Sequence, residues 1–87
     1  MWTFSAAIFR KGGGGEMMLP KLQERFQEEV EDYKKYRELA EHARKEGHRE
    51  MGRILDRIAR DEHSHAYALG RYVEDTEANK RLWESIK

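Results

Sequence analysis

Apolar residues recur along most of this chain at alternating spacings of four and three, which is the pattern of helices that pack against other helices. No glycine or proline interrupts the stretch from Pro20 to Glu46, and Pro20 suits the first turn of a helix. Gly47 follows the segment ARKE, a typical helix end with basic residues before a glycine. A second long stretch follows, so residues 19–75 are predicted to form an antiparallel hairpin of two helices of about 25 residues, each about 40 Å long.

The recurring positions define one core-facing stripe on each helix. The stripe of the first helix contains Leu22, Phe26, Glu29, Tyr33, Tyr36, Ala40 and Ala43. The stripe of the second contains Met51, Leu55, Ile58, Glu62, His65, Leu69 and Tyr72. Glu29, Glu62 and His65 are therefore ionisable residues at positions that normally hold apolar side chains. Glu29 lies 18 residues before Gly47 and Glu62 lies 15 after it, so their heights differ by about 4–5 Å and the three side chains can converge.

Two shorter segments flank the hairpin. In residues 76–87, Thr76 is expected to cap a short helix with Leu82, Trp83 and Ile86 on one side, which docks on the hairpin or on another subunit. Residues 1–18 are expected to be a flexible extension with a glycine linker at 12–15, or to precede a true start at Met17 or Met18. Their basic pair follows the apolar run, which argues against a secretory signal.

Composition limits the classes of protein that remain. The chain has 87 residues, of which 38% are apolar and 39% charged, so one copy can close only a small core. It has no cysteine for disulfides or thiolate metal sites. The charges of its 17 basic and 17 acidic residues cancel, which disfavours nucleic-acid binding. No apolar run is long enough to span a membrane. We therefore expect a protein stabilised by a metal, a partner subunit, or both. The absence of cysteine leaves the redox compartment open, and the location that we expect is the cytoplasm.

The three ionisable residues favour a shared metal site. Leaving them buried and unpaired would cost several kcal/mol each in a small domain. Two hairpins paired in a four-helix bundle would bring together four glutamates and two histidines, and two divalent ions would neutralise the carboxylates. A Glu-x-x-His pair such as Glu62 and His65 is the ligand pattern of di-iron carboxylate bundles. Mostly oxygen ligands with one imidazole per metal favour iron, with manganese as the alternative, over structural zinc.

Neighbouring residues are candidates for supporting roles. Asp32 is either an extra metal ligand or a surface residue. Tyr33 and Tyr36 are expected in the core, with hydroxyls that can hydrogen-bond a ligating carboxylate, and Asp61 can orient a ligand histidine. The remaining histidines are expected to lie in solvent: His42, His48 and His63.

The segment EVEDYKKYRELAEHARKEG at 29–47 and the segment EHSHA at 62–66 together resemble the first hairpin of the rubrerythrin branch of the ferritin-like superfamily. The resemblance covers about 38 residues and implies that Glu29, Glu62 and His65 are the metal ligands and catalytic residues, with Tyr36 beside them. A second hairpin and a cysteine-rich rubredoxin module do not occur in this sequence. The first departure points to half-length members similar to encapsulated ferritins, and the second argues against a self-contained peroxidase.

That resemblance implies an all-α protein whose single hairpin and short C-terminal helix complete a four-helix bundle by dimerisation. It implies a ferroxidase, with two iron ions per dimer, in a homodimer or a higher even-numbered oligomer that stores or detoxifies iron. The segment FSAAIFRK at 4–11 resembles encapsulin loading peptides, which implies an encapsulin shell as a partner. The alternatives are a peroxide scavenger with an external reductant, a metal sensor or store, and a structural dimer whose polar residues fix the register.

Overall fold

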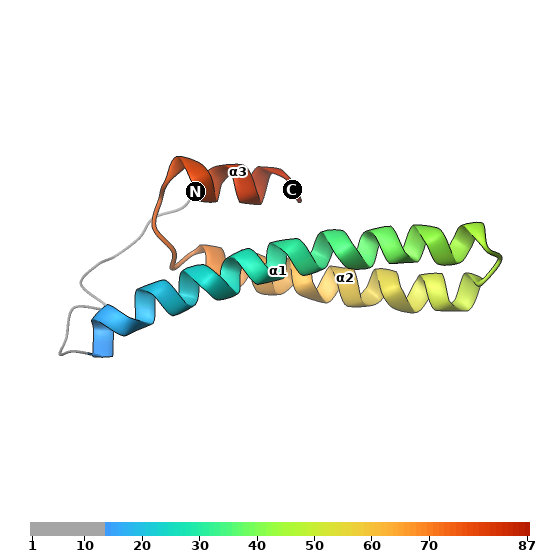
Figure 1. The fold of residues 1–87 in the computed structure, drawn as a ribbon, viewed down its shortest axis with the longest axis horizontal. Coiled ribbons are helices and arrows are strands. Elements are labelled where there is room, and N and C mark those ends of the chain that lie inside the picture. The colour runs from blue at the N-terminus through green and yellow to red at the C-terminus, as the bar shows by residue number, and fades with distance from the viewer. Residues whose placement is uncertain (1–13) are drawn as a thin grey trace.

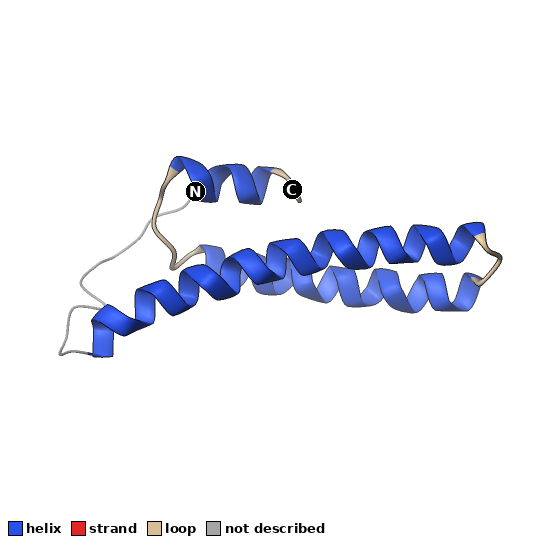
Figure 2. Cartoon of the chain, viewed as in Figure 1, coloured by secondary structure: helices blue, strands red, loops and turns tan. Residues whose placement is uncertain are grey.

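The computed structural model describes residues 14–87, and these residues contain three helices and no strand (Figures 1 and 2). The helices are α1 (Gly14–Lys45), α2 (Arg49–Gly70) and α3 (Glu77–Glu84). Helices α1 and α2 run antiparallel side by side, and α3 runs roughly along α1, beside the half of the hairpin that is farther from the turn (Figure 1). The predicted all-α hairpin with a short C-terminal helix is confirmed. The segment FSAAIFRK lies outside the described residues.

The turn between α1 and α2 is built around Gly47. Its φ of +86° lies in the left-handed region, which glycine adopts without strain from a Cβ atom. The backbone amide of His48 donates to the carbonyl oxygen of Ala43 at 2.8 Å, and the backbone amide of Gly47 donates to the carbonyl oxygen of Arg44 at 3.0 Å. These two bonds form a Schellman motif, which satisfies carbonyls at the end of α1. The predicted helix end is confirmed.

The start of α1 differs from the prediction. The helix begins at Gly14, so Pro20 lies inside it instead of in its first turn. Gly14 and Gly15, expected in a linker, are helical. A proline at this position removes one backbone donor of the helix, but the residues after it are strong helix formers that continue the helix to Lys45. Local sequence signals marked the proline correctly as an early helical residue and placed the first residue too late.

Small residues form the α2 side of the contact between the two long helices. The buried residues of α2 are Gly52, Ala59, Ala66 and Gly70. The predicted stripe is one position away from these residues, and its members Met51, His65 and Tyr72 are exposed in the single chain. Two helices approach closely where their side chains are small, so the contact with α1 uses the positions next to the predicted stripe. The packing of that stripe against a second subunit stays a prediction.

Gly52 shows how close this approach is. A Cβ atom added there would lie 2.9 Å from Cγ of Arg44 and 3.4 Å from the carbonyl oxygen of Ala40. The same Arg44 extends across the helix pair and its Nη1 donates to Oδ2 of Asp56 at 2.7 Å. The hairpin is therefore joined near its turn by close backbone packing and by an interhelical ion pair.

The hydrophobic core lies at the other end, under α3. Its buried members come from α1, from α2 and the loop after it, and from the C-terminal segment: Phe26, Val30, Ala66, Val73 and Ile86. Leu82 and Trp83 of α3 pack against this cluster. The predicted apolar side of the C-terminal helix and its docking on the hairpin are confirmed.

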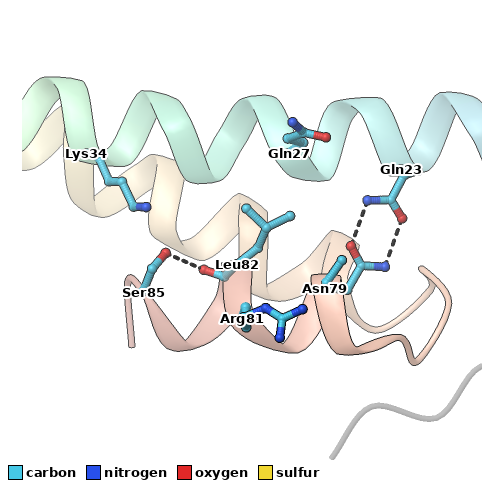
Figure 3. A pocket seen from close by; sticks show the side chains of 8 residues that line it. Gln23, Gln27, Lys34, Asn79, Arg81, Leu82 and Ser85 are labelled. Atoms are coloured by element: carbon cyan, nitrogen blue, oxygen red, sulfur yellow. Dashed lines mark hydrogen bonds between the residues drawn. The ribbon is translucent and has the colours of Figure 1, made fainter.

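Asn79 attaches α3 to α1 and to the preceding loop. It is 2% exposed, and its amide exchanges two hydrogen bonds with that of Gln23, at 2.7 and 2.8 Å (Figure 3). Its Nδ2 also donates to the carbonyl of Glu74 at 2.8 Å. Its backbone amide donates to Oγ1 of Thr76 at 3.1 Å, so Thr76 caps α3 as predicted. Both polar atoms of this buried side chain therefore have hydrogen-bond partners.

The described chain leaves much apolar surface in contact with solvent. Its long dimensions are 53 × 23 × 14 Å, so it is flat and elongated. Large apolar side chains that are about half exposed occur along both long helices and just after α2: Met18, Leu39, Met51, Ile54, Tyr67 and Tyr72. None of the helices within residues 14–87 combines the length and the hydropathy that a bilayer crossing requires.

Candidate metal centre

Glu29 is a buried carboxylate on α1. Its side chain is 4% exposed, because it lies between the fully buried residues Phe26 and Val30 on the face that meets α2. The stretch around it contains no helix-breaking residue, so the backbone holds it at a fixed height above the turn. Burial of a carboxylate in such a small core is expensive unless a partner compensates its charge.

Glu62 and His65 lie on α2 at positions i and i+3, which places both side chains on one face of the helix. The Glu62 side chain is 20% exposed and that of His65 is 60% exposed. Nδ1 of His65 lies 3.5 Å from Oε1 of Glu29 and 3.6 Å from Oε1 of Glu62. The structure thus brings the three predicted residues together, although His65 lies at the edge of the hairpin and not in its interior.

Glu29, Glu62 and His65 also satisfy the simplest geometric condition for a metal site. Each offers one ligand atom, and these atoms lie within 4.8 Å of one another. Oε1 of Glu29 is buried and has no hydrogen-bond partner, which is a costly state for a carboxylate oxygen. A cation bound there would remove this cost. The donor set of oxygen and imidazole is one that iron or manganese accepts.

The electrostatics of the cluster show that its negative charge is only partly compensated. Hydrogen bonding to Glu29, then burial and the charge of Glu29, raise the pKa of the Glu62 carboxyl, while His65 lowers it. Arg25, one turn before Glu29 on α1, donates from Nη2 to Oε2 of Glu29 and from Nη1 to Oε1 of Glu28 at 2.5 Å. Ionisation of both carboxyl groups is therefore unfavourable, and Arg25 compensates the charge of Glu29.

The predicted supporting residues lie on the same two helices as the three converging residues. Asp32 and Tyr36 are half-buried on α1, and Asp61 is exposed on α2. Asp32 does not belong to the group of converging ligand atoms among the described residues. A role for Asp32 as an extra ligand, for Asp61 in orienting a histidine, and for Tyr36 in hydrogen-bonding a ligand stays a prediction.

His63 was expected in solvent, and this was wrong. Its ring is half-buried, and its Nε2 lies 3.0 Å from the carbonyl oxygen of Ile86. Its ring centroid lies 5.2 Å from that of Tyr33, with the rings edge to face, and 5.0 Å from that of Trp83. The C-terminal segment covers this histidine, and local periodicity contains no information on that contact. His42 and His48 are exposed as predicted.

Two further residues of the site region were missed by the sequence interpretation. Arg25 was one of 17 basic residues, and only its position four before Glu29 connects it with the cluster. No role was predicted for Asn79, which attaches α3 to α1. The spacing of Arg25 could have revealed its contact, whereas that of Asn79 depends on the long-range packing of α3.

Ferritin-like carboxylate bundles are built from helical hairpins of this kind, in which two facing helices bring a Glu and a Glu-x-x-His pair to one point. The sequence model of the Rubrerythrin family matches residues 21–86, and the chain belongs to this family. No curated protein and no solved structure gives a significant match. Because rubrerythrin-type domains bind iron, family membership and the Glu/His cluster together indicate a protein of the di-iron carboxylate type.

Proposed function

We propose that this protein is a ferroxidase, which binds Fe(II) as a substrate at Glu29, Glu62 and His65 and oxidises it with O2 or peroxide for iron storage or detoxification. The observation that supports it most directly is the buried Oε1 of Glu29, which has no hydrogen-bond partner and faces Nδ1 of His65 at 3.5 Å. An orphaned buried oxygen beside two further ligand groups is explained by a cation that binds all three.

The same geometry favours a second copy of the chain as the other half of the site. Two carboxylates and one imidazole leave an iron ion short of the ligands it prefers. His65 is 60% exposed, so the cluster is accessible from outside the hairpin. A second hairpin related by a two-fold axis would add the same three groups, and two Fe(II) ions would balance the four carboxylate charges. The half-exposed apolar side chains on both helices would then become the core of a four-helix bundle.

In this proposal each side chain has a defined task. Glu29 and Glu62 supply negative charge that attracts two Fe(II) ions and stabilises the Fe(III) products. His65 supplies a neutral nitrogen ligand, which limits the negative charge of the site. The two electrons of two Fe(II) ions reduce one O2, with two protons, to hydrogen peroxide, so no separate reductant is needed. The helices hold both ions in one partly water-excluded place, which makes the two-electron step accessible.

The test is an anaerobic Fe(II) titration of metal-free protein followed by addition of O2, with absorbance and light-scattering mass recorded in parallel. Wild-type protein should saturate near one iron per chain as an even-numbered oligomer and oxidise iron faster than buffer does. Glu62→Gln should lose both properties. Glu41→Gln, which removes an exposed carboxylate of α1, is the matched control and should behave as wild type. Equal curves for all three proteins would refute the proposal and leave a structural helical dimer.

Peroxide scavenging is the second candidate, because the family match is to Rubrerythrin. It predicts sustained consumption of hydrogen peroxide when an external electron donor is present and catalytic amounts of iron are bound. The ferroxidase proposal predicts that peroxide consumption stops when the Fe(II) is exhausted. Measuring peroxide with and without a donor therefore separates the two functions.

We also propose that residues 4–11 deliver the protein to an encapsulin shell in the cytoplasm. The support is the similarity of FSAAIFRK to encapsulin loading peptides. Coexpression with an encapsulin shell, with and without these residues, tests this. Copurification with the shell that depends on residues 4–11 is the expected result, and equal copurification of both forms would refute it.

A further inference from the structure

Within the described residues, Arg25 contacts the Glu29 carboxylate although it cannot itself be a metal ligand. Its guanidinium bridges two carboxylates: Nη2 donates to Oε2 of the buried Glu29, and Nη1 donates to Oε1 of Glu28. The Arg25 side chain is 55% exposed, as is about half of Glu28, whereas Glu29 is almost completely buried. The arginine thus extends from solvent to a carboxylate that solvent does not reach.

The charge on Arg25 interacts with several carboxylates in and beside the metal centre. Hydrogen bonding to Glu28 and the charges of Glu29, Glu28 and Glu62 raise the pKa of the guanidinium. It therefore acts on the same two carboxylates, Glu29 and Glu62, that would bind the metal. A divalent ion on these carboxylates would lie close to the guanidinium and would be repelled by it.

The two cations also differ in how easily they can leave. Arg25 has a long flexible side chain, most of it in water, and a second carboxylate, Glu28, that can retain its charge at the surface. Glu29 has no comparable freedom, because it is buried in the contact between the helices. When a metal and Arg25 compete for Glu29, the arginine is the partner that can move at low cost.

We propose that Arg25 is a displaceable counter-cation: it neutralises Glu29 in the metal-free protein and is released toward Glu28 and solvent when a divalent metal binds. This inference rests on the proposed metal site. It explains how the hairpin folds before metal arrives although two carboxylates face each other. It also means that the metal affinity is set below what the ligands alone would provide, which favours release of the metal over permanent retention.

The experiment measures Mn(II) binding to the full chain by the loss of the free Mn(II) EPR signal, and thermal unfolding with and without metal by circular dichroism. Arg25→Gln should bind Mn(II) up to about fivefold more tightly than wild type, since an exposed ion pair competes only weakly with the metal. The metal-free variant should unfold at a lower temperature. Arg25→Lys, which retains the charge, should restore most of the wild-type behaviour.

Arg53→Gln is the matched control. It removes the same charge from an exposed arginine that pairs with Glu50 near the turn, at 2.8 Å, and it should leave Mn(II) affinity unchanged. Unchanged or weaker Mn(II) binding by Arg25→Gln would overturn the proposal, because Arg25 would then be a structural residue or would help to position Glu29. Absence of saturable Mn(II) binding by the wild type would instead overturn the proposed metal site, and the counter-cation role with it.

Discussion

Replacing Glu29 with glutamine should change metal-free stability and metal binding in opposite directions. The substitution preserves size and removes one buried charge. The orphaned Oε1 costs about 1–3 kcal/mol in the metal-free fold, and the solvent-screened pair with Arg25 offsets only a small part of this cost. The variant should therefore be more stable without metal by about 1–2 kcal/mol, or roughly 4–15 °C in Tm for a domain of this size.

Metal should reverse the order of the two proteins. Wild type should gain about 2.7 kcal/mol when free metal is present at 100 times its Kd, because the ligand binds only the folded state. Glu29→Gln should gain almost nothing, since it lacks the central carboxylate of the cluster. Thermal unfolding followed by circular dichroism, in chelator and in Mn(II), measures both effects at one protein concentration.

The control is Glu38→Gln, an exposed glutamate on the same helix, which should unfold within about 0.5 kcal/mol of wild type in both conditions. If Glu29→Gln were clearly less stable without metal, the buried carboxylate would be contributing to the fold through its pair with Arg25. If metal still raised its Tm as in wild type, Glu29 would not be a ligand. Either result refutes the reasoning.

Three further predictions concern pH and the fold. Because the folded-state pKa of Glu62 is raised, metal-free wild type should gain stability relative to Glu62→Gln as the pH falls through that pKa. The metal affinity of wild type should fall over the same pH range, because protons compete with the metal for the carboxylate. Unfolding measured against pH, with and without Mn(II), tests both expectations. Asn79→Ala should lose about 2–3 kcal/mol in urea unfolding because three side-chain hydrogen bonds disappear, whereas Lys80→Ala should change little. Gly47→Ala should lose about 1 kcal/mol in the same assay, since alanine is strained at a φ of +86°, and an unchanged midpoint would contradict the role assigned to the turn.

Features that depend on nearby residues could be predicted from the sequence. The turn at Gly47 and the cap at Thr76 are local hydrogen-bond patterns, and both occur as expected. The meeting of Glu29 with Glu62 and His65 was also predictable, because the turn fixes the register of two antiparallel helices and the rise per residue fixes the height of each side chain.

Features that depend on which surfaces touch could not be predicted in the same way. The α2 contact uses Gly52, Ala59 and Ala66, because close packing selects small residues, and a search for large apolar residues misses them. The half-buried His63 depends on the position of Trp83 and Ile86, which no local pattern specifies.

The sequence by itself determined the helices, their turn and the height at which two glutamates and a histidine meet, because rise per residue and turn chemistry are local properties. Only the tertiary structure decided that Glu29 is buried with one oxygen unpaired, that Arg25 neutralises the other oxygen, and that His65 lies at an open edge. Burial, charge compensation and accessibility depend on how whole surfaces pack, and side chains far apart in the sequence contribute to each of them.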